Sequence, residues 1–407
     1  MKTVKGAYGE ALIYTDLVDD KSIDQVKLLM DQPFVKGQQV RMMPDIHAGV
    51  GCTIGTTMTV NDKICPNLVG VDIGCGMLAA NIGKVDVDFD KFDKAVRALI
   101  PSGMNIRSWV SPEMFRYMEM LRIDTSLWCS DSIDVDRAEL SMGTLGGGNH
   151  FIELNRAQSN DVVWMVIHTG SRHLGLEVAN YYQKLAIKEL KGCKWSSSAI
   201  IEELKRQGRQ REIQATLQKM KAEACNIPDA LCYLEHESFQ HYMHDIEIVQ
   251  NYAEFNRDCI MYTLCAAMGW KPRFSFHTKH NYVSIYRRML RKGAVSAEWG
   301  DTLIIPMNMR DGSLLCEGKG NPDWNYSAPH GAGRIMSRAQ ARNNIDLGDY
   351  ARTMEDAGIW TSSVNLGTLD EAPQAYKPME SIVENIQDTV KILDVLKPIY
   401  NFKASSE

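Results

Sequence analysis

The chain has 407 residues, with 45 Lys and Arg against 51 Asp and Glu, which gives a formal net charge of −6. Hydrophobic residues at 44% and charged residues at 24% are typical of a globular protein and exclude wholesale disorder. No apolar run reaches the roughly 18 residues that span a bilayer, and the N-terminal sequence MKTVKGAYGE lacks the apolar core of a secretory signal. We therefore expect a cytoplasmic protein without membrane association, whose ten cysteines stay reduced.

The first half of the chain predicts strands, turns and one clear helix. Residues 1–70 read as short strands and turns, with one strand over 56–60. The segment 89–100 (FDKFDKAVRALI) has the spacing of an amphipathic helix. The segment 161–168 (DVVWMVIH) is typical of a buried strand that runs into the turn TGSRHLG.

Helical periodicity dominates residues 175–270, which include the highly charged stretch 200–224. Strands return near 273–305, and a helix is expected to begin directly after the HGAGR segment at 330–334. The segment 381–397 (SIVENIQDTVKILDVLK) predicts a last helix.

Segments with candidate functional residues are spread over the whole chain, at 45–76, 149–172, 277–297, 327–334 and 376–403. The sequence has no internal repeats and no linker long enough to separate domains. If these segments share one site, that site needs the whole chain. We therefore expect one integrated α+β domain over residues 1–407, with a helical excursion at about 180–265.

The segment VGVDIGCGM holds the first candidate metal ligands, Asp72 and Cys75, three positions apart among glycines. Glycine allows sharp backbone turns, so the carboxylate and the thiolate can point at one place. Oxygen and sulfur together suit manganese, iron, cobalt or zinc. The alternative is a turn in which Cys75 is a small buried hydrophobic residue.

In GTLGGGNHFIEL, four glycines in six residues precede Asn149, His150 and Glu153. Such a run allows a close backbone approach to a phosphate, although it does not match the phosphate-loop pattern that ends in Gly-Lys-Ser or Gly-Lys-Thr. Glu153 is equally compatible with an ordinary surface carboxylate.

His168 ends the predicted buried strand, where a histidine is well placed to be a metal ligand or a general base. A core histidine with satisfied hydrogen bonds is the alternative. Arg172, in the turn that follows, can bind phosphate oxygens with its guanidinium fork. His277 and His280 also lie where an apolar strand meets polar residues.

His330 lies in SAPHGAGR, beside two glycines and Arg334, at the expected start of a helix. Helix N-termini attract anions, so a histidine there could attack a phosphorus atom and form a phosphoramidate. A role as metal ligand or general acid stays open. The combination favours phosphate chemistry.

Together these segments resemble the RtcB-type RNA ligase family. The motifs PDIHAGVG, VGVDIGCGM, GTLGGGNHFIE, HTGSR, HNYV, RKGAVSA and SAPHGAGR occur in that family's order and spacing, from about residue 40 to the C-terminus. The resemblance implies a single RtcB-like domain with mixed β-sheets around a metal site. It also implies joining of an RNA 3′-phosphate or 2′,3′-cyclic phosphate end to a 5′-hydroxyl end, in tRNA splicing or RNA repair, with GTP and two Mn²⁺ ions.

The resemblance also implies roles for particular residues. The expected manganese ligands are Asp72, Cys75, His150, His168 and His280, with Cys75 as the bridging thiolate. The expected catalytic residues are His330, which would take GMP from GTP, Asp45 near the reacting ends, and Arg172 on a phosphate. Asn149 and Arg334 resemble phosphate-binding residues, and Glu153, Tyr376 and Lys403 resemble guanine-binding ones.

The sequence departs from the usual family pattern at Lys279, His173 and Ala328, which suits a divergent repair paralogue. Because the whole chain is acidic, RNA must be bound by local basic residues. The candidates are Arg287, Arg288, Arg291, Lys292, Arg338 and Arg342.

Two other functions use the same residues. A two-metal phosphodiesterase or phosphatase would use the Asp, Cys and His set without a covalent histidine. A non-catalytic subunit of an RNA-repair complex would keep the metals for structure. For the ligase, the family resemblance also implies an archease-like activator as a possible partner, and we expect a monomer.

Overall fold

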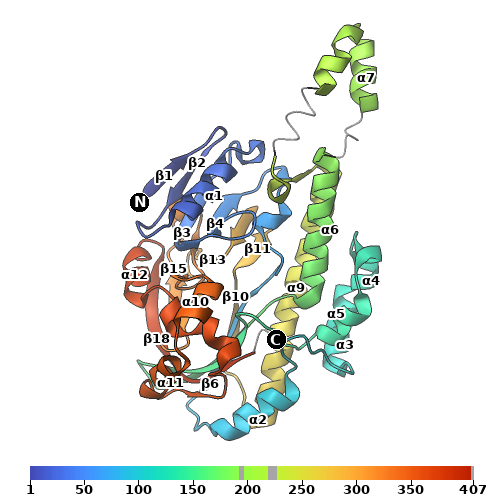
Figure 1. Cartoon of the computed structure of the whole chain (residues 1–407). Helices are drawn as coiled ribbons and strands as arrows, with labels where there is room; N and C mark the ends of the chain where they lie inside the picture. The colour runs from blue at the N-terminus through green and yellow to red at the C-terminus, as the bar shows by residue number, and fades with distance from the viewer. Residues whose placement is uncertain (192–196, 219–226, 405–407) are drawn as a thin grey trace.

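The computed structural model describes residues 1–191, 197–218 and 227–404, and its framework is a pair of β-sheets (Figure 1). The larger sheet has eight strands in the order β10-β6-β8-β7-β18-β15-β14, with β17 beside β18. Its strands are β6 (Gly76–Gly83), β7 (Phe151–Ala157), β8 (Val163–Thr169), β10 (Phe274–Lys279), β14 (Thr302–Asn308), β15 (Gly312–Gly318), β17 (Trp360–Thr361) and β18 (Val390–Lys403).

The smaller sheet has six strands in the order β1-β2-β3-β4-β12-β11. They are β1 (Lys2–Lys5), β2 (Glu10–Ile13), β3 (Val40–His47), β4 (Ile54–Thr59), β11 (Asn281–Ser284) and β12 (Met289–Lys292). Two further pairs of strands join β13 (Ala294–Ser296) to β16 (Ser327–Pro329) and β5 (Lys63–Ile64) to β9 (Leu234–Glu235). Because β10 and β11 follow each other in the chain, the residue between them, His280, lies where the two sheets meet.

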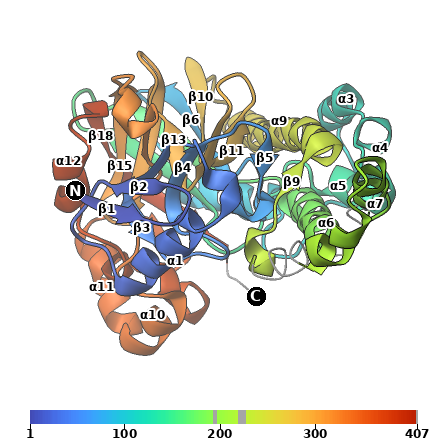
Figure 2. The same cartoon turned by 90° about the horizontal axis from the view of Figure 1, so that it is seen from above.

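Two long helices, α6 (Arg172–Lys191) and α9 (His236–Met268), lie beside the sheets (Figures 1 and 2). In Figure 1, α7 (Ser197–Arg206) stands apart from them. The other α-helices are α1 (Asp20–Met30), α2 (Phe89–Leu99), α3 (Pro112–Leu121), α4 (Ile123–Ser126), α5 (Val135–Ser141), α10 (Arg338–Asn344), α11 (Leu347–Asp356) and α12 (Met379–Asn385). Within the described ranges, no helix is both long and apolar enough to cross a membrane.

One α+β domain is formed, as predicted, and its core explains why. Side chains from β6, β8, α9 and β18 share one buried hydrophobic cluster, which includes Leu78, Ile167, Leu264 and Phe402. The helical region expected at 180–265 contains α7 and most of α6 and α9, but α9 packs directly on β6 and β8. Part of that region therefore belongs to the core.

Several predicted elements are confirmed and two are wrong. Helix α2 and strand β8 match the segments predicted at 89–100 and 161–168. The helix expected after HGAGR begins only at Arg338, so His330 does not lie at a helix N-terminus. The last helix predicted at 381–397 is wrong, because α12 ends at Asn385 and β18 follows. Part of the charged stretch at 200–224 lies outside the described residues.

Candidate functional site

The pairing of three neighbouring strands brings the predicted ligands together at one edge of the larger sheet. Gly76, the first residue of β6, pairs with Thr169 on β8 and with Lys279 on β10. Cys75, His168 and His280 are the chain neighbours of these three residues, so all three ligands lie in one place. His150 joins them because β7 pairs with β8 with Phe151 opposite His168.

The ligand atoms form two overlapping groups that share the thiol of Cys75. Its Sγ lies 3.3 Å from Nε2 of His168 and 3.6 Å from Nε2 of His150. Nε2 of His168 lies 3.4 Å from Nε2 of His280, and Nε2 of His150 lies 3.0 Å from Oδ2 of Asp72. In each group, Cys75–His168–His280 and Asp72–Cys75–His150, the ligand atoms are all within 4.8 Å of one another.

The donor atoms of this cluster fit a divalent cation. Nδ1 of His150 lies 2.9 Å from the carbonyl oxygen of Leu145, and Nδ1 of His168 lies 3.1 Å from that of Asn149. A carbonyl oxygen only accepts hydrogen bonds, so both rings carry their proton on Nδ1. In the neutral rings the Nε2 lone pairs then face a carboxylate, a thiol and each other, an arrangement that a shared cation would stabilise.

The surroundings of the cluster keep two of its imidazoles, those of His168 and His280, neutral. Burial, followed by neighbouring histidines, holds the pKa values of His168 and His280 well below the usual range. Burial and the nearby Asp72 carboxylate raise the pKa of the Cys75 thiol well above its usual range. A bound cation would reverse this last effect, because a coordinating thiol is deprotonated.

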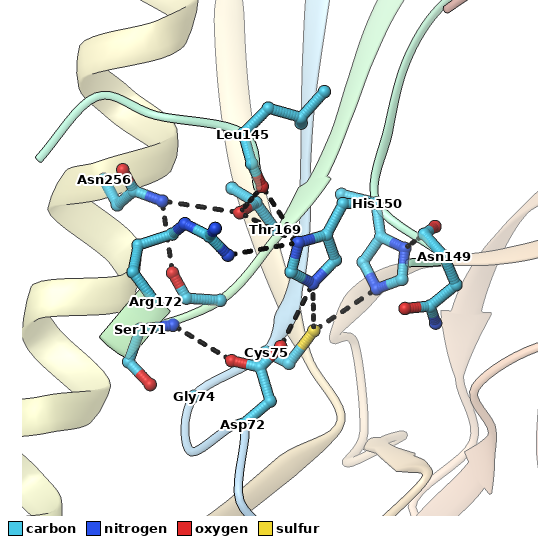
Figure 3. Close-up of polar contacts among 12 residues, drawn as sticks. Asp72, Gly74, Cys75, Leu145, Asn149, His150, Thr169, Ser171, Arg172 and Asn256 are labelled. Carbon is cyan, nitrogen blue, oxygen red and sulfur yellow. Dashed lines mark hydrogen bonds and ion pairs between the residues drawn. The ribbon is translucent and has the colours of Figure 1, made fainter. Parts of the chain in front are cut away.

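Arg172 and Asp72 lie next to His150 (Figure 3), and both pack closely against glycines. A Cβ on Gly170 would lie 2.0 Å from Oδ1 of Asp72, and one on Gly146 would lie 1.9 Å from Nη2 of Arg172. Arg172 begins α6 with a φ of 58° and donates from Nε to the Thr144 hydroxyl at 3.3 Å. The glycine-rich segment 143–148 thus supports an arginine beside the cluster.

His330 and Asp45 form the second part of the site. Nδ1 of His330 lies 2.6 Å from Oδ2 of Asp45, whose carboxylate also accepts the His330 backbone N–H at 3.1 Å. Asp45 is fully buried. The His330 ring lies 4.9 Å from the ring of His280, centre to centre. His330 is therefore oriented by a carboxylate and lies next to the ligand cluster.

A cavity of about 210 Å³ connects these residues with the predicted nucleotide contacts. The predicted site residues that line it are Asn149, Glu153, His168, His280, His330, Arg334, Tyr376 and Lys403. They come from β7 and the residues just before it, from β8, from the β10–β11 junction, from the turn after β16, from the segment before α12 and from β18. The structure therefore brings the predicted nucleotide residues and the candidate nucleophile to one cavity.

Glu153 is a buried carboxyl group at the wall of this cavity. It accepts hydrogen bonds from the side-chain amides of Asn401 and Asn155. Burial raises its pKa to about 7, although the positive charge of Lys403 opposes the shift. This side chain therefore changes its charge near neutral pH.

Sequence reasoning missed the acidic pair Asp370 and Glu371. Glu371 accepts hydrogen bonds from Tyr376 at 2.6 Å and from Lys403, and it also pairs with Arg334 at 3.3 Å. Burial raises the pKa of Glu371, but Lys403 and Arg338 outweigh burial and bring it to about 2. Glu371 thus positions three predicted nucleotide residues. The motif comparison gave no signal for it, because it lies in a short 3-10 turn, 366–371, outside the matched motifs.

A second missed pair, Asn256 and Arg257, holds the backbone behind the cluster. Oδ1 of Asn256 accepts from the N–H groups of Gly143 and Thr144 at 2.8 and 3.1 Å. Nη1 of Arg257 donates to the carbonyls of Gly74 and Thr169 at 2.9 and 2.8 Å. Both residues are fully buried on α9. The sequence feature that could have revealed them is a pair of polar residues on an otherwise apolar helix face.

The structure corrects the prediction for two of the candidate RNA-binding residues and shows ionic partners for three others. Arg291 and Lys292 are not free to bind RNA, because both are buried and donate to groups of the protein, Arg291 to Ser327 and Lys292 to the carbonyl of Val50. Arg338 and Arg342 pair with Asp370, and Arg287 pairs with Glu298. His277 pairs with Asp258 rather than with the cluster.

The comparisons with known proteins show the family to which the chain belongs. The family model described as tRNA-splicing ligase RtcB matches residues 25–404, so the chain belongs to the RtcB family. The RNA-splicing ligases RtcB1 and RtcB of two Escherichia coli strains are each 28% identical to the chain, with 90% of both chains covered. The tRNA-splicing ligase RtcB of Nanoarchaeum equitans is 25% identical, with 92% of this chain and 90% of the relative covered.

Proposed function

We propose that this protein is a GTP-dependent RNA ligase that joins a 3′-phosphate or 2′,3′-cyclic phosphate end to a 5′-hydroxyl end. Membership of the RtcB family supports ligation of RNA. The observation that carries the covalent mechanism is the pairing of His330 with the buried Asp45 carboxylate at the wall of the cavity. A phosphodiesterase that uses only metal-bound water would not need an oriented histidine there.

In the proposed first step, Nε2 of His330 attacks the α-phosphorus of GTP. A carboxylate accepts hydrogen bonds, so Asp45 keeps the proton of the neutral His330 ring on Nδ1 and leaves the Nε2 lone pair free. A bond forms between Nε2 and the α-phosphorus while the bond to pyrophosphate breaks. The Asp45 carboxylate stabilises the positive charge that develops on the ring.

Three groups of residues would hold the nucleotide during this step. The Glu153 carboxylate can accept hydrogen bonds from the N1–H and amino group of guanine, which adenine cannot donate in the same pattern. Tyr376 and Lys403, held by Glu371, line the same end of the cavity. Asn149, Arg172 and Arg334 would contact phosphate oxygens.

Asp72, Cys75, His150, His168 and His280 would hold two Mn²⁺ ions. When bound, these ions would polarise the phosphates and offset the charge that develops at phosphorus. His330 then passes GMP to the RNA 3′-phosphate, and attack by the 5′-hydroxyl expels GMP and joins the strands. A cyclic phosphate end would first be opened by water to a 3′-phosphate.

A matrix of RNA ends tests this proposal. Strands that end in 3′-phosphate, 2′,3′-cyclic phosphate or 3′-hydroxyl are mixed with 5′-hydroxyl or 5′-phosphate strands, and GTP or ATP is added with Mn²⁺. We expect joining only of 3′-phosphate or cyclic phosphate to 5′-hydroxyl, and only with GTP. Joining of 3′-hydroxyl to 5′-phosphate ends, or opening of the cyclic phosphate without joining, would contradict the proposal.

The remaining features of this function stay predictions from the sequence. They are the cytoplasmic location, the monomeric state and an archease-like activator. Gel filtration of the purified chain tests the monomer, and joining assays without any added protein test the need for an activator.

A further inference from the structure

A second histidine that lines the cavity is held by Asp45. His47 is the last residue of β3, and its Nδ1 lies 2.8 Å from the backbone carbonyl oxygen of Asp45. Asp45 therefore orients two imidazoles, His330 through its carboxylate and His47 through its main chain. Both rings line the cavity that also contains His280.

The hydrogen bond to Asp45 determines which nitrogen of His47 is free. A carbonyl oxygen accepts only, so Nδ1 carries the proton and Nε2 has a lone pair when the ring is neutral. Within the described part of the chain, no group bonds to Nε2 of His47. Burial, followed by the nearby His330 and Lys377, lowers the pKa of His47 from its ordinary value, although Asp45 opposes the shift. The ring is therefore a base at neutral pH.

The backbone around His47 is rigid enough for such a role. Lys377 Nζ donates to the carbonyls of Pro44 at 3.1 Å and Ile46 at 3.5 Å, which flank Asp45. A Cβ on Gly333 would lie 2.7 Å from the carbonyl oxygen of Asp45, so the turn after His330 packs directly on this strand. His47 is thus held at a fixed position relative to the proposed nucleophile.

The other imidazoles at the cavity are already engaged. Nε2 of His168 and Nε2 of His280 belong to the ligand cluster, and Nε2 of His330 is the proposed nucleophile. Among the described residues that line the cavity, His47 is the one histidine whose free nitrogen has no such role. The joining step, however, requires a base, because the attacking 5′-hydroxyl must lose its proton.

We propose that His47 is the general base that takes the proton of the RNA 5′-hydroxyl when the strands are joined. This inference rests on the proposed ligase function. In the step, a bond forms between the 5′ oxygen and the phosphorus of the RNA 3′-phosphate, and the bond from that phosphorus to GMP breaks. The proton moves to Nε2 of His47, and GMP leaves with the electron pair of the broken bond.

The test separates the joining step from guanylylation. RNA that already carries diphosphate-linked guanosine at its 3′ end is mixed with a 5′-hydroxyl strand and an excess of enzyme, and the rate of joining is measured. We expect His47→Asn to join about 10²- to 10⁴-fold more slowly than wild type, the usual contribution of a general base. The rate at which His330 takes GMP from GTP should stay within about threefold of wild type, which also shows that the variant is folded.

A strand with a 5′-thiol in place of the 5′-hydroxyl distinguishes a base from a residue that only positions the strand. A thiol loses its proton far more readily than an alcohol, so the defect of His47→Asn should shrink to less than about tenfold. The control is His236→Asn, since His236 is exposed at the start of α9, outside the cavity. This variant should match wild type in every assay.

Three results would overturn the assignment of His47. They are joining by His47→Asn within about threefold of wild type, an equal loss of guanylylation and joining, and an equal defect with hydroxyl and thiol strands. If wild type itself neither takes GMP from GTP nor joins the activated strand, the proposed ligase function fails instead. The two failures are therefore distinguishable.

Discussion

The carboxylate of Asp45 lies 2.6 Å from Nδ1 of His330, although the two residues are 285 positions apart in the sequence. This contact joins the end of β3 to the turn after β16, and it selects the tautomer that the proposed nucleophile needs. The same carboxylate accepts the backbone N–H of His330 at 3.1 Å, so ring and backbone are fixed together.

Asp45→Asn should therefore impair the guanylylation of His330. An amide can donate to Nδ1 and favour the wrong tautomer, which costs a comparable Asp–His pair about 10⁴-fold in rate. We expect the rate of His330–GMP formation to fall about 10²- to 10⁴-fold, with little change in the affinity for GTP. The control is Asp62→Asn, an exposed aspartate outside the site. A normal rate in Asp45→Asn would show that the contact does not orient the nucleophile.

The two ligand groups predict different metal losses. Cys75 belongs to both groups, whereas His280 belongs only to the group with His168. We expect about two Mn²⁺ per wild-type chain, about one in His280→Ala and close to none in Cys75→Ser. Metal content after equilibrium dialysis measures this directly, with the buried Cys316→Ser, outside the site, as the control. Equal metal content in all four proteins would remove the basis for a binuclear site.

Two glycines of one loop allow a matched test of whether the position of the Arg172 guanidinium matters for RNA joining. Gly146 and Gly148 have φ values of 79° and 75°, so alanine strains the backbone similarly at both, by about 1–2 kcal/mol. Only at Gly146 would the new Cβ meet the Arg172 guanidinium, whereas at Gly148 it meets nothing within 4 Å. We expect Gly146→Ala to lower the rate of RNA joining at least about tenfold more than Gly148→Ala. Equal defects would attribute the effect to backbone strain alone.

The pKa of about 7 at Glu153 predicts that GTP binding depends on pH. Only the ionised carboxylate accepts from guanine, and its fraction falls about tenfold between pH 8 and pH 6. The dissociation constant for GTP should therefore rise about tenfold over this range. The phosphates of GTP also titrate, but they do so equally with both proteins. In Glu153→Gln, the part of the pH dependence of GTP affinity that comes from Glu153 should therefore disappear. Identical profiles would contradict a role of Glu153 in binding guanine.

The ionisation of Glu153 also affects the stability of the fold. A rise in pH should strengthen GTP binding but lower the free energy of unfolding. Burial raises the pKa of Glu153 above its ordinary value of 4.5, so the folded protein binds the proton more tightly than the unfolded chain. Its contribution to stability is therefore fully present below about pH 4.5 and is lost as the pH rises through about 7. As the pH rises from about 4.5 to above about 7, the wild-type free energy of unfolding should fall by on the order of 1–3 kcal/mol relative to that of Glu153→Gln. Urea unfolding across this pH range measures the difference.

The short motifs predicted which residues meet in space better than periodicity predicted the elements. The predicted ligands and His330 meet at one place because each lies at a strand end or in a glycine turn that the motifs preserve. The segment at 390–397, by contrast, is apolar at spacings that fit a helix as well as a strand. It forms β18 because it pairs with β7 on one side and β15 on the other, which local sequence does not encode.

Residues outside the motifs were not predictable in the same way. Glu371 bonds to Lys403, 32 positions away, and Asn256 bonds to Gly143, 113 positions away, so only the folded chain shows their roles. Arg291 and Lys292 looked like an exposed basic patch, but their strand, β12, lies in the interior of the smaller sheet, where both are buried. Charge alone does not distinguish a buried cation from an exposed one.

The most direct test of the proposed function is the transfer of GMP to His330. Wild-type protein and His330→Ala are incubated with Mn²⁺ and GTP labelled at the α-phosphate, and the protein is examined for an acid-labile adduct. We predict that wild type is labelled, that His330→Ala is not, and that GTP labelled at the γ-phosphate labels neither protein. An unlabelled wild type, or equal labelling of His330→Ala, would contradict the proposed mechanism.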